Sequence, residues 1–181
     1  MWSILDRTYF ACFLCPHEHS IIKLEIIMNL LLVQHGQAKT KEEDPERSLS
    51  LVGAESAEKM AKWLYVSGVE VTEIYHSGKK RAEQTALIFA KYLSPQRGVK
   101  ATSGLNPMDD VRHAADEVRK HPGPLMLVGH LPFMSRLTGL LVAGDPEVEP
   151  VRFKNAGVVC LGEYEGQWSV EWMVAASLLK E

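Results

Sequence analysis

The feature that most constrains the fold is an apolar run ending beside a histidine, and it occurs twice in the chain. Leu30-Leu31-Leu32-Val33 leads into Gln34-His35-Gly36, and Leu125-Met126-Leu127-Val128 leads into Gly129-His130. Runs of large aliphatic residues are typical of strands buried on both faces, as in a parallel sheet. Open α/β folds bind ligands at the carboxyl edge of such a sheet. We therefore expect His35 and His130 to lie at that edge.

The bulk composition predicts one soluble globular domain. The chain has 181 residues, of which 46% are hydrophobic and 24% are charged. A net charge of −3 offers no basic excess for nucleic acid, and no run approaches the roughly 20 apolar residues that span a bilayer. We therefore expect neither a nucleic-acid partner nor a membrane partner. The odd count of 3 cysteines, without a secretory signal, favours a reducing compartment and a cytoplasmic location.

Residues 1–27 differ from the rest, because aromatic residues alternate irregularly with Cys12, Cys15, His17 and His19. These side chains are of types that zinc accepts, but the gap between the cysteines and histidines is too short for a usual finger. The segment also lacks the basic region and apolar core of a targeting peptide. We interpret it as an N-terminal extension, either disordered or packed on the surface. Met28 stands directly before the first strand and is an alternative translation start, so the domain is expected to cover residues 28–181.

Strands and helices alternate along the remaining chain, which predicts an α/β fold. Apolar residues recur at spacings of three and four after Ser50, as expected for an amphipathic helix that Ser67-Gly68 ends. Two further strands are expected at 69–75 and 99–101. Three further helices are expected: one that ends near Leu93, one over 108–120 and one that begins after Pro132. The chain is expected to close with a hairpin that turns at Glu165-Gly166.

A third strand-to-helix junction carries Lys79, Lys80 and Arg81. Helix N-termini present free N–H groups and a partial positive charge, so an anion is the expected ligand. Basic residues in a first turn oppose the helix dipole, and this local conflict indicates function at Arg81. Lys79 and Lys80, unlike Arg81, are better explained as a solvated basic patch.

Over residues 28–174 the sequence resembles the histidine phosphatase superfamily, and most closely its small SixA-like phosphohistidine phosphatases. The resemblance depends on four motifs in order: Leu32-Val33-Gln34-His35-Gly36-Gln37-Ala38, Leu49-Ser50-Leu51-Val52-Gly53, Ser77-Gly78-Lys79-Lys80-Arg81-Ala82-Glu83-Gln84-Thr85 and Val128-Gly129-His130-Leu131-Pro132. It implies a three-layer α/β/α sandwich with a mostly parallel central sheet.

The resemblance also implies a catalytic set of His35, Arg81 and His130. A neutral His35 would attack phosphorus and form a phosphohistidine intermediate that water hydrolyses. Arg81 would offer a planar fork to two phosphoryl oxygens, and His130 would donate a further hydrogen bond. This arrangement requires no metal and no cofactor.

One residue departs from the family motif Arg-His-Gly, because Gln34 precedes His35. Glutamine donates only through a neutral amide, so the change would cost roughly 10²–10³ in rate by analogy with removing an oxyanion-hole donor. We assign phosphate binding to Gln34, Arg81 and His130, with Lys39, Lys79 or Lys80 as compensating cations.

The sequence indicates no clear general acid. Asp109 and Asp110 follow Pro107 where an acid would enter, but acidic residues there commonly start helices. We interpret His76 and His113 as surface or capping residues. Trp168 and Trp172 are expected to pack in the core.

The function expected from these observations is hydrolysis of phosphohistidine on a protein partner, in signal transduction. One alternative is a phosphatase for small phosphorylated substrates. The other, motivated by Gln34, is a non-catalytic module that binds phosphate or a phosphoprotein. The sequence indicates no oligomeric state.

Overall fold

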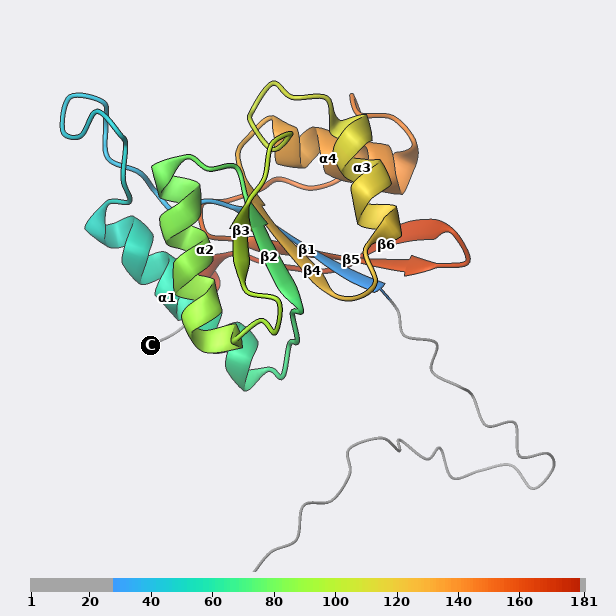
Figure 1. The fold of residues 1–181 in the computed structure, drawn as a ribbon, viewed down its shortest axis with the longest axis horizontal. Helices are drawn as coiled ribbons and strands as arrows, with labels where there is room; N and C mark the ends of the chain where they lie inside the picture. Colours follow the sequence, from blue (N-terminus) through green and yellow to red (C-terminus); the bar gives the residue numbers. More distant parts are fainter. Residues whose placement is uncertain (1–27, 180–181) are drawn as a thin grey trace, which may run out of the picture.

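A computed structural model describes residues 28–179, which form a six-stranded sheet in the order β3-β2-β4-β1-β5-β6 with helices on both faces (Figure 1). The prediction for residues 1–27, with the cysteine and histidine cluster, lies outside the described residues. The strands are β1 (Met28–Gln34), β2 (Glu73–His76), β3 (Val99–Ala101), β4 (Leu125–Gly129), β5 (Val158–Tyr164) and β6 (Gln167–Val174). The helices are α1 (Leu51–Val66), α2 (Lys80–Leu93), α3 (Val111–Lys120), α4 (Phe133–Ala143) and the 3-10 turn η1 (Ala176–Leu178).

The four strands β3, β2, β4 and β1 run parallel, and the hairpin β5-β6 adds two antiparallel strands beside β1. The two apolar runs noted in the sequence are direct neighbours, with Leu31 paired to Met126 and Gln34 paired to Gly129. His35 and His130 therefore leave the sheet side by side at its carboxyl edge. The prediction of a mostly parallel sheet is confirmed.

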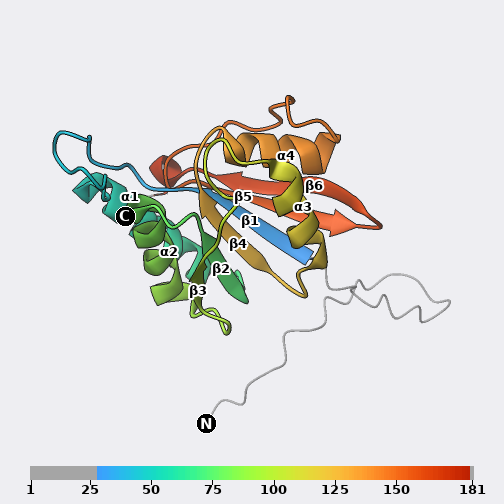
Figure 2. The same ribbon diagram turned by 45° about the horizontal axis from the view of Figure 1, so that its top comes forward.

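Alternate residues of the central strands enter two separate cores, one on each face of the sheet. Leu30 and Leu32 pack with α3 and α4, whereas Leu31 and Val33 pack with α1 and α2. Figure 2 shows the two helix pairs on opposite sides of the strands. The four residues Leu30 to Val33 of β1 are completely buried and point alternately to the two faces of the sheet, which explains the continuous run of aliphatic residues. The three-layer α/β/α sandwich is confirmed.

Two element boundaries differ from the sequence prediction. Residues 69–72 are not part of β2, because the N–H of Val69 bonds to the end of α1 at Leu64 and that of Thr72 bonds to Pro124. Helix α3 begins at Val111 and not at Met108, since Asp110 is its N-cap and accepts a hydrogen bond from the N–H of Arg112 at 3.0 Å.

A β-bulge in the last hairpin separates the two tryptophans. Cys160 pairs with Trp172 but the next residue of β5, Leu161, pairs with Val170, so Glu171 is the extra residue in β6. The bulge reverses the alternation of side chains. Trp168 is buried in the core beneath α3 and α4, and Trp172 packs against the other core, where its ring lies 6.0 Å from that of Trp63.

Within the described residues, no helix is both long enough and apolar enough to cross a membrane.

Candidate active site

His35 is the first residue after β1, and both of its ring nitrogens are held. Nδ1 lies 2.7 Å from the carbonyl oxygen of Gly36, and Nε of Arg81 donates to Nε2 at 3.1 Å. A carbonyl only accepts, so the ring carries its hydrogen on Nδ1 and a lone pair on Nε2. Burial lowers the pKa of His35 to about 4, with Arg81 and Arg47 lowering it further against the raising effect of Gly36. His35 is therefore a neutral imidazole at physiological pH.

The motif Arg-Ala-Glu-Gln-Thr in α2 fixes the loops around His35. Besides the bond from Arg81, the hydroxyl of Thr85 accepts from the N–H of Gly36 at 3.0 Å. The same hydroxyl donates to the carbonyl of Arg81 at 2.7 Å, and the side-chain oxygen of Gln84 accepts from the N–H of Leu49 at 2.7 Å. One helical turn thus positions both the guanidinium and the loop that it faces.

Two glycines allow the loop after His35 to lie directly on the first turn of α1. A Cβ atom on Gly36 would come 2.6 Å from the carbonyl oxygen of Gly53, and a Cβ on Gly53 would come 2.0 Å from that of Gln37. Ser50 caps α1 at this point, with its hydroxyl accepting from the N–H of Gly53 at 3.1 Å. The second motif of the sequence, which contains Ser50 and Gly53, therefore fixes where the chain turns after His35.

His130 follows β4 and is 2% exposed, and its ring centroid lies 4.9 Å from that of His35. Its Nε2 is 2.6 Å from the hydroxyl oxygen of Ser77, whereas its Nδ1 is buried without a hydrogen-bond partner among the described residues. Burial lowers the pKa of His130 to about 3, and the nearby His35, Arg81, Lys79 and Arg47 lower it further. The three predicted residues His35, Arg81 and His130 are thus brought together.

The side chain of Gln34 is hydrogen-bonded to Asn155, a residue that the sequence analysis did not identify as part of the site. Its Nε2 donates to Oδ1 of Asn155 at 2.6 Å, and its Oε1 is buried without a partner among the described residues. Asn155 precedes β5, the antiparallel neighbour of β1. No local motif identifies Asn155, because its position depends on the pairing of strands distant in sequence.

Apart from Arg81, the cations that influence the site are Arg47, which the sequence analysis did not name, and Lys79, which it did. Arg47 lowers the pKa of His35, Arg81 and His130 by its charge, and Lys79 lowers that of His130. Lys80 instead pairs with Glu83 at 3.0 Å. Arg47 lies in a charged loop without apolar periodicity and has a left-handed φ of 53°, which is uncommon for a residue with a long side chain.

The remaining candidates have structural roles. Asp110 caps α3, which confirms its interpretation as a helix-start residue. Asp109 instead accepts from the backbone N–H of Asn106 at 2.8 Å and closes the turn before the helix. His113 is exposed, as expected. His76 is only 6% exposed, so of the two roles predicted for it the surface one is wrong and the capping one is supported. Its Nδ1 accepts from the N–H of Gly78 at 3.2 Å and closes the turn that leads to Ser77.

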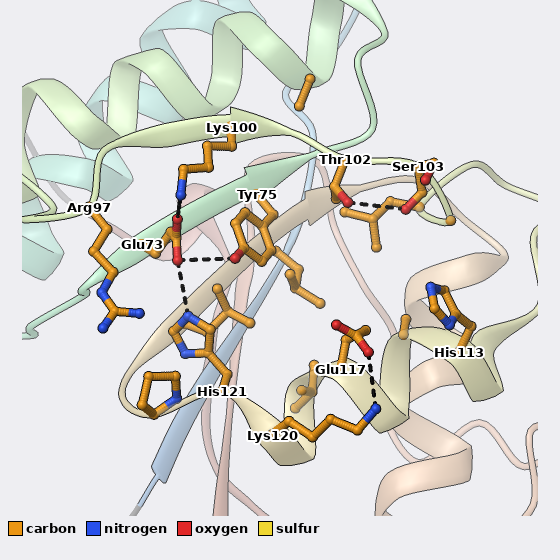
Figure 3. A pocket seen from close by; sticks show the side chains of 18 residues that line it. Glu73, Tyr75, Arg97, Lys100, Thr102, Ser103, His113, Glu117, Lys120 and His121 are labelled. Carbon is orange, nitrogen blue, oxygen red and sulfur yellow. Dashed lines mark hydrogen bonds and ion pairs between the residues drawn. The ribbon is translucent and has the colours of Figure 1, made fainter.

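A cavity of about 460 Å³ lies between α3 and the β2-β3 edge, and none of His35, Arg81 and His130 lines it. Figure 3 shows the side chain of Glu73 between those of Lys100, Tyr75 and His121. Glu73 is 2% exposed and accepts from the Tyr75 hydroxyl at 3.0 Å, while Nε2 of His121 lies at 3.2 Å. Burial alone would raise the pKa of Glu73, but hydrogen bonds from Lys100, His121 and Tyr75 outweigh it and lower the pKa. The cluster compensates a buried charge and stabilises the edge of the sheet.

Among residues 28–179, no group of three or more His, Cys, Asp or Glu side chains is arranged to hold a metal ion. The residues that converge at the carboxyl edge of the sheet define the class of site: two neutral imidazoles and a guanidinium surrounded by further cations. Such a set suits a tetrahedral oxyanion, because it offers a nucleophile and several donors without a competing carboxylate.

Residues 30–110 match the model of the histidine phosphatase superfamily (branch 1). The solved structure of the protein histidine phosphatase SixA complexed with tungstate has a TM-score of 0.75, 24% identity and coverage of 84% of this chain and 100% of that one. The resemblance to the histidine phosphatase superfamily is therefore confirmed by sequence and by fold, and it supports a phosphatase.

Other similar structures differ in the substrates that their names state. A protein described as a SixA phosphohistidine phosphatase, from Agrobacterium tumefaciens, has a TM-score of 0.69 and 18% identity, covering 83% of this chain and 99% of its own. One described as an α-ribazole-5'-phosphate phosphatase, from Escherichia coli, has a TM-score of 0.70 and 14% identity, covering 82% and 97%. At these identities the likeness is one of fold. No curated protein matches the sequence.

Proposed function

We propose that this protein is a phosphohistidine phosphatase, which removes the phosphoryl group from a phosphoprotein through a covalent intermediate on His35. The observation that carries the proposal is the state of the His35 ring: neutral, hydrogen-bonded through Nδ1 to Gly36, and with its Nε2 lone pair facing the guanidinium of Arg81. A lone pair beside a fixed cation is what a nucleophile for a phosphate anion requires.

In the first step Nε2 of His35 attacks phosphorus, and the bond from phosphorus to the leaving nitrogen of the substrate breaks. Arg81 releases its hydrogen bond to Nε2 and donates to the phosphoryl oxygens, together with His130. Lys79 and Arg47 add positive potential around the same atoms. These cations supply the charge neutralisation that phosphoryl transfer needs, so we propose a mechanism that is independent of metal ions.

In the second step water attacks phosphorus and the bond to Nε2 of His35 breaks. The carbonyl of Gly36 keeps hydrogen on Nδ1 throughout, so the phosphorylated ring carries a positive charge. A cationic imidazole leaves more easily than an anionic one, because it takes back the bonding electrons as a neutral ring. The contact at 2.7 Å therefore favours hydrolysis of the intermediate as well as its formation.

The surroundings of the two imidazoles favour phosphohistidine over an ester as the substrate. The charged groups that influence the pKa values of His35 and His130 are cations and each other, with no carboxylate among them. An alkoxide leaving group needs a strong general acid, whereas an imidazole leaving group needs only a weak one. The SixA structures share this fold, but so does the α-ribazole-5'-phosphate phosphatase, so the choice of substrate rests on the surroundings of the two imidazoles.

The test is to trap the intermediate. Protein is mixed with a phosphohistidine-bearing protein labelled with ³²P, and the reaction is quenched in alkali. Label is expected on the wild type, stable in alkali and lost in acid, and absent from His35→Ala with a fall in rate of about 10³-fold or more. His113→Ala is the matched control, because His113 is an exposed histidine outside the site. Label that persists in His35→Ala would overturn the proposal.

A comparison of substrates separates the alternatives. Faster turnover of a small phosphate ester than of phosphohistidine protein would favour a small-molecule phosphatase. No turnover of either substrate, with inorganic phosphate still bound through Arg81, would favour the non-catalytic binding module. The buried Oε1 of Gln34 is the observation that supports the binding-module alternative, since an unpaired acceptor repels a phosphate oxygen and would slow catalysis.

A further inference from the structure

Ser77 is a polar residue of the site to which no motif assigns a role. Its hydroxyl oxygen lies 2.6 Å from Nε2 of His130. The two residues follow neighbouring parallel strands, since His76 at the end of β2 pairs with Val128 near the end of β4. The turn at Gly78, with φ of 79°, and the hydrogen bond from Gly78 to the ring of His76 hold this loop at the carboxyl edge.

Because Ser77 contacts Nε2, Nδ1 is the one ring nitrogen of His130 that has no hydrogen-bond partner in the described part of the chain. Nε2 is engaged by the serine, and Nδ1 is buried without a partner in the described part of the chain. A buried polar atom without a partner costs free energy, so its presence in the site indicates a ligand that completes it. The ring of His35 is the neighbour on this side of the site, with centroids 4.9 Å apart. A phosphoryl group bonded to His35 would therefore come within reach of the His130 ring, whose Nδ1 is its one nitrogen without a partner in the described part of the chain.

The direction of the serine hydrogen decides what Nδ1 can do. Phosphoryl oxygens are acceptors, so His130 assists only if Nδ1 carries hydrogen. Burial keeps the ring neutral by lowering its pKa to about 3, and a neutral ring has one hydrogen to place. If Nε2 donated to Ser77, Nδ1 would present a lone pair to the phosphoryl group and repel it. If Ser77 donates to Nε2, the hydrogen is on Nδ1.

We infer that Ser77 is a positioning residue that donates its hydroxyl hydrogen to Nε2 of His130 and so fixes the tautomer in which Nδ1–H faces the phosphoryl group. This inference rests on the proposed function, because it takes a phosphoryl group as the ligand. In this arrangement His130 donates a hydrogen bond through Nδ1 while its ring stays neutral. It also explains why a deeply buried histidine serves this site.

The test reads the tautomer directly. Long-range ¹H–¹⁵N spectra of the histidine side chains are recorded at neutral pH for the wild type, with and without inorganic phosphate. We expect the phosphate complex to show a protonated Nδ1 and an unprotonated Nε2 for His130. Ser77→Ala is expected to populate both tautomers and to weaken phosphate binding by about tenfold. Ser77→Thr, which keeps a hydroxyl, is expected to restore both properties.

Two controls make the result decisive. Ser177→Ala removes an exposed serine from η1 and should change neither spectrum nor affinity. The spectra also report on the fold of Ser77→Ala, since the other histidines must keep their wild-type signals. A protonated Nε2 in the wild-type phosphate complex would overturn the inference, as would an unchanged tautomer and affinity in Ser77→Ala. Failure to trap a phosphoenzyme would instead count against the proposed function, because these spectra need no turnover.

Discussion

Arg81 donates its Nε hydrogen to Nε2 of His35 across 3.1 Å, so the proposed nucleophile and the cation proposed to bind the phosphoryl group are in contact in the free protein. A proton that reached Nε2 would displace this bond and place two positive charges side by side. The site is thus built to keep His35 unprotonated, and phosphate binding exchanges one acceptor of Arg81 for another.

The titration of His35 is the first prediction. Its pKa is about 4, because burial and the charges of Arg81 and Arg47 disfavour the protonated ring. The ring signals in an NMR titration of the free protein should therefore move well below pH 6.5, the ordinary value for histidine. Arg81→Gln should raise the midpoint, since it removes a positive charge. A wild-type midpoint at or above 6 would contradict this account.

The pH dependence of stability follows from the same shift. Between pH 6.5 and about 4 the unfolded chain binds more protons at His35 than the folded one. Its contribution to stability is therefore present above pH 6.5 and is lost as the pH falls toward 4. Urea denaturation over this pH range should show a smaller loss of stability in His35→Ala than in the wild type.

A charged residue at position 34 should increase the rate. Gln34→Arg adds a permanent charge and a bidentate fork beside the nucleophile, and we expect kcat/KM to rise by about 10²-fold. Steady-state kinetics with a phosphohistidine protein measure the effect. Gln37→Arg supplies the matched control, because it adds the same charge at an exposed position three residues further along the chain. An unchanged or lower rate would mean that the amide pair of Gln34 and Asn155 tunes the site instead of impairing it.

Loss of the positive charge at position 47 should weaken substrate binding. Arg47→Gln keeps a long polar side chain, and we expect KM to rise by about three- to tenfold because the residue is exposed and its charge acts partly through solvent. The effect should diminish at high salt. Lys41→Gln, an exposed residue of the same loop, is the control. Equal effects of the two substitutions would show that only the net charge of the loop matters.

The buried carboxylate of Glu73, in the cavity between α3 and the β2-β3 edge, should matter for stability and not for catalysis. His121→Ala leaves Oε2 of Glu73 with the Tyr75 hydroxyl alone, and we expect the free energy of unfolding to fall by about 1–3 kcal/mol. Urea denaturation measures the change. Lys120→Ala removes an exposed ion pair with Glu117 and should cost about 0–1 kcal/mol. A large loss of kcat in His121→Ala, with the fold intact, would assign this cavity to the reaction.

The sequence predicts those parts of the fold and site that depend on local chemistry. Continuous aliphatic runs show that β1 and β4 are buried on both faces, and the glycine and histidine after them mark the carboxyl edge. Ser50 and the apolar spacing after it indicate α1, and Asp110 indicates the start of α3. His35, Arg81 and His130 are therefore recognisable from the sequence, because each is adjacent to a strong local signal.

The residues that were missed depend on distant parts of the chain. Arg47 reaches the site from a charged loop with no periodicity, and Asn155 meets Gln34 only because β5 pairs with β1. Ser77 has a role only because β2 lies beside β4. The buried position of His76 and the separate positions of Trp168 and Trp172 depend on sheet order and on one bulge. No local pattern encodes these relationships.

The bulge at Glu171 bears on how the domain comes apart. Because β6 supplies Trp168 to one core and Trp172 to the other, detachment of this single edge strand would expose apolar surface on both faces together. Loss of this strand would therefore weaken the packing of both helix layers. The domain is accordingly expected to unfold in a single cooperative transition, because the terminal hairpin packs against both helix layers.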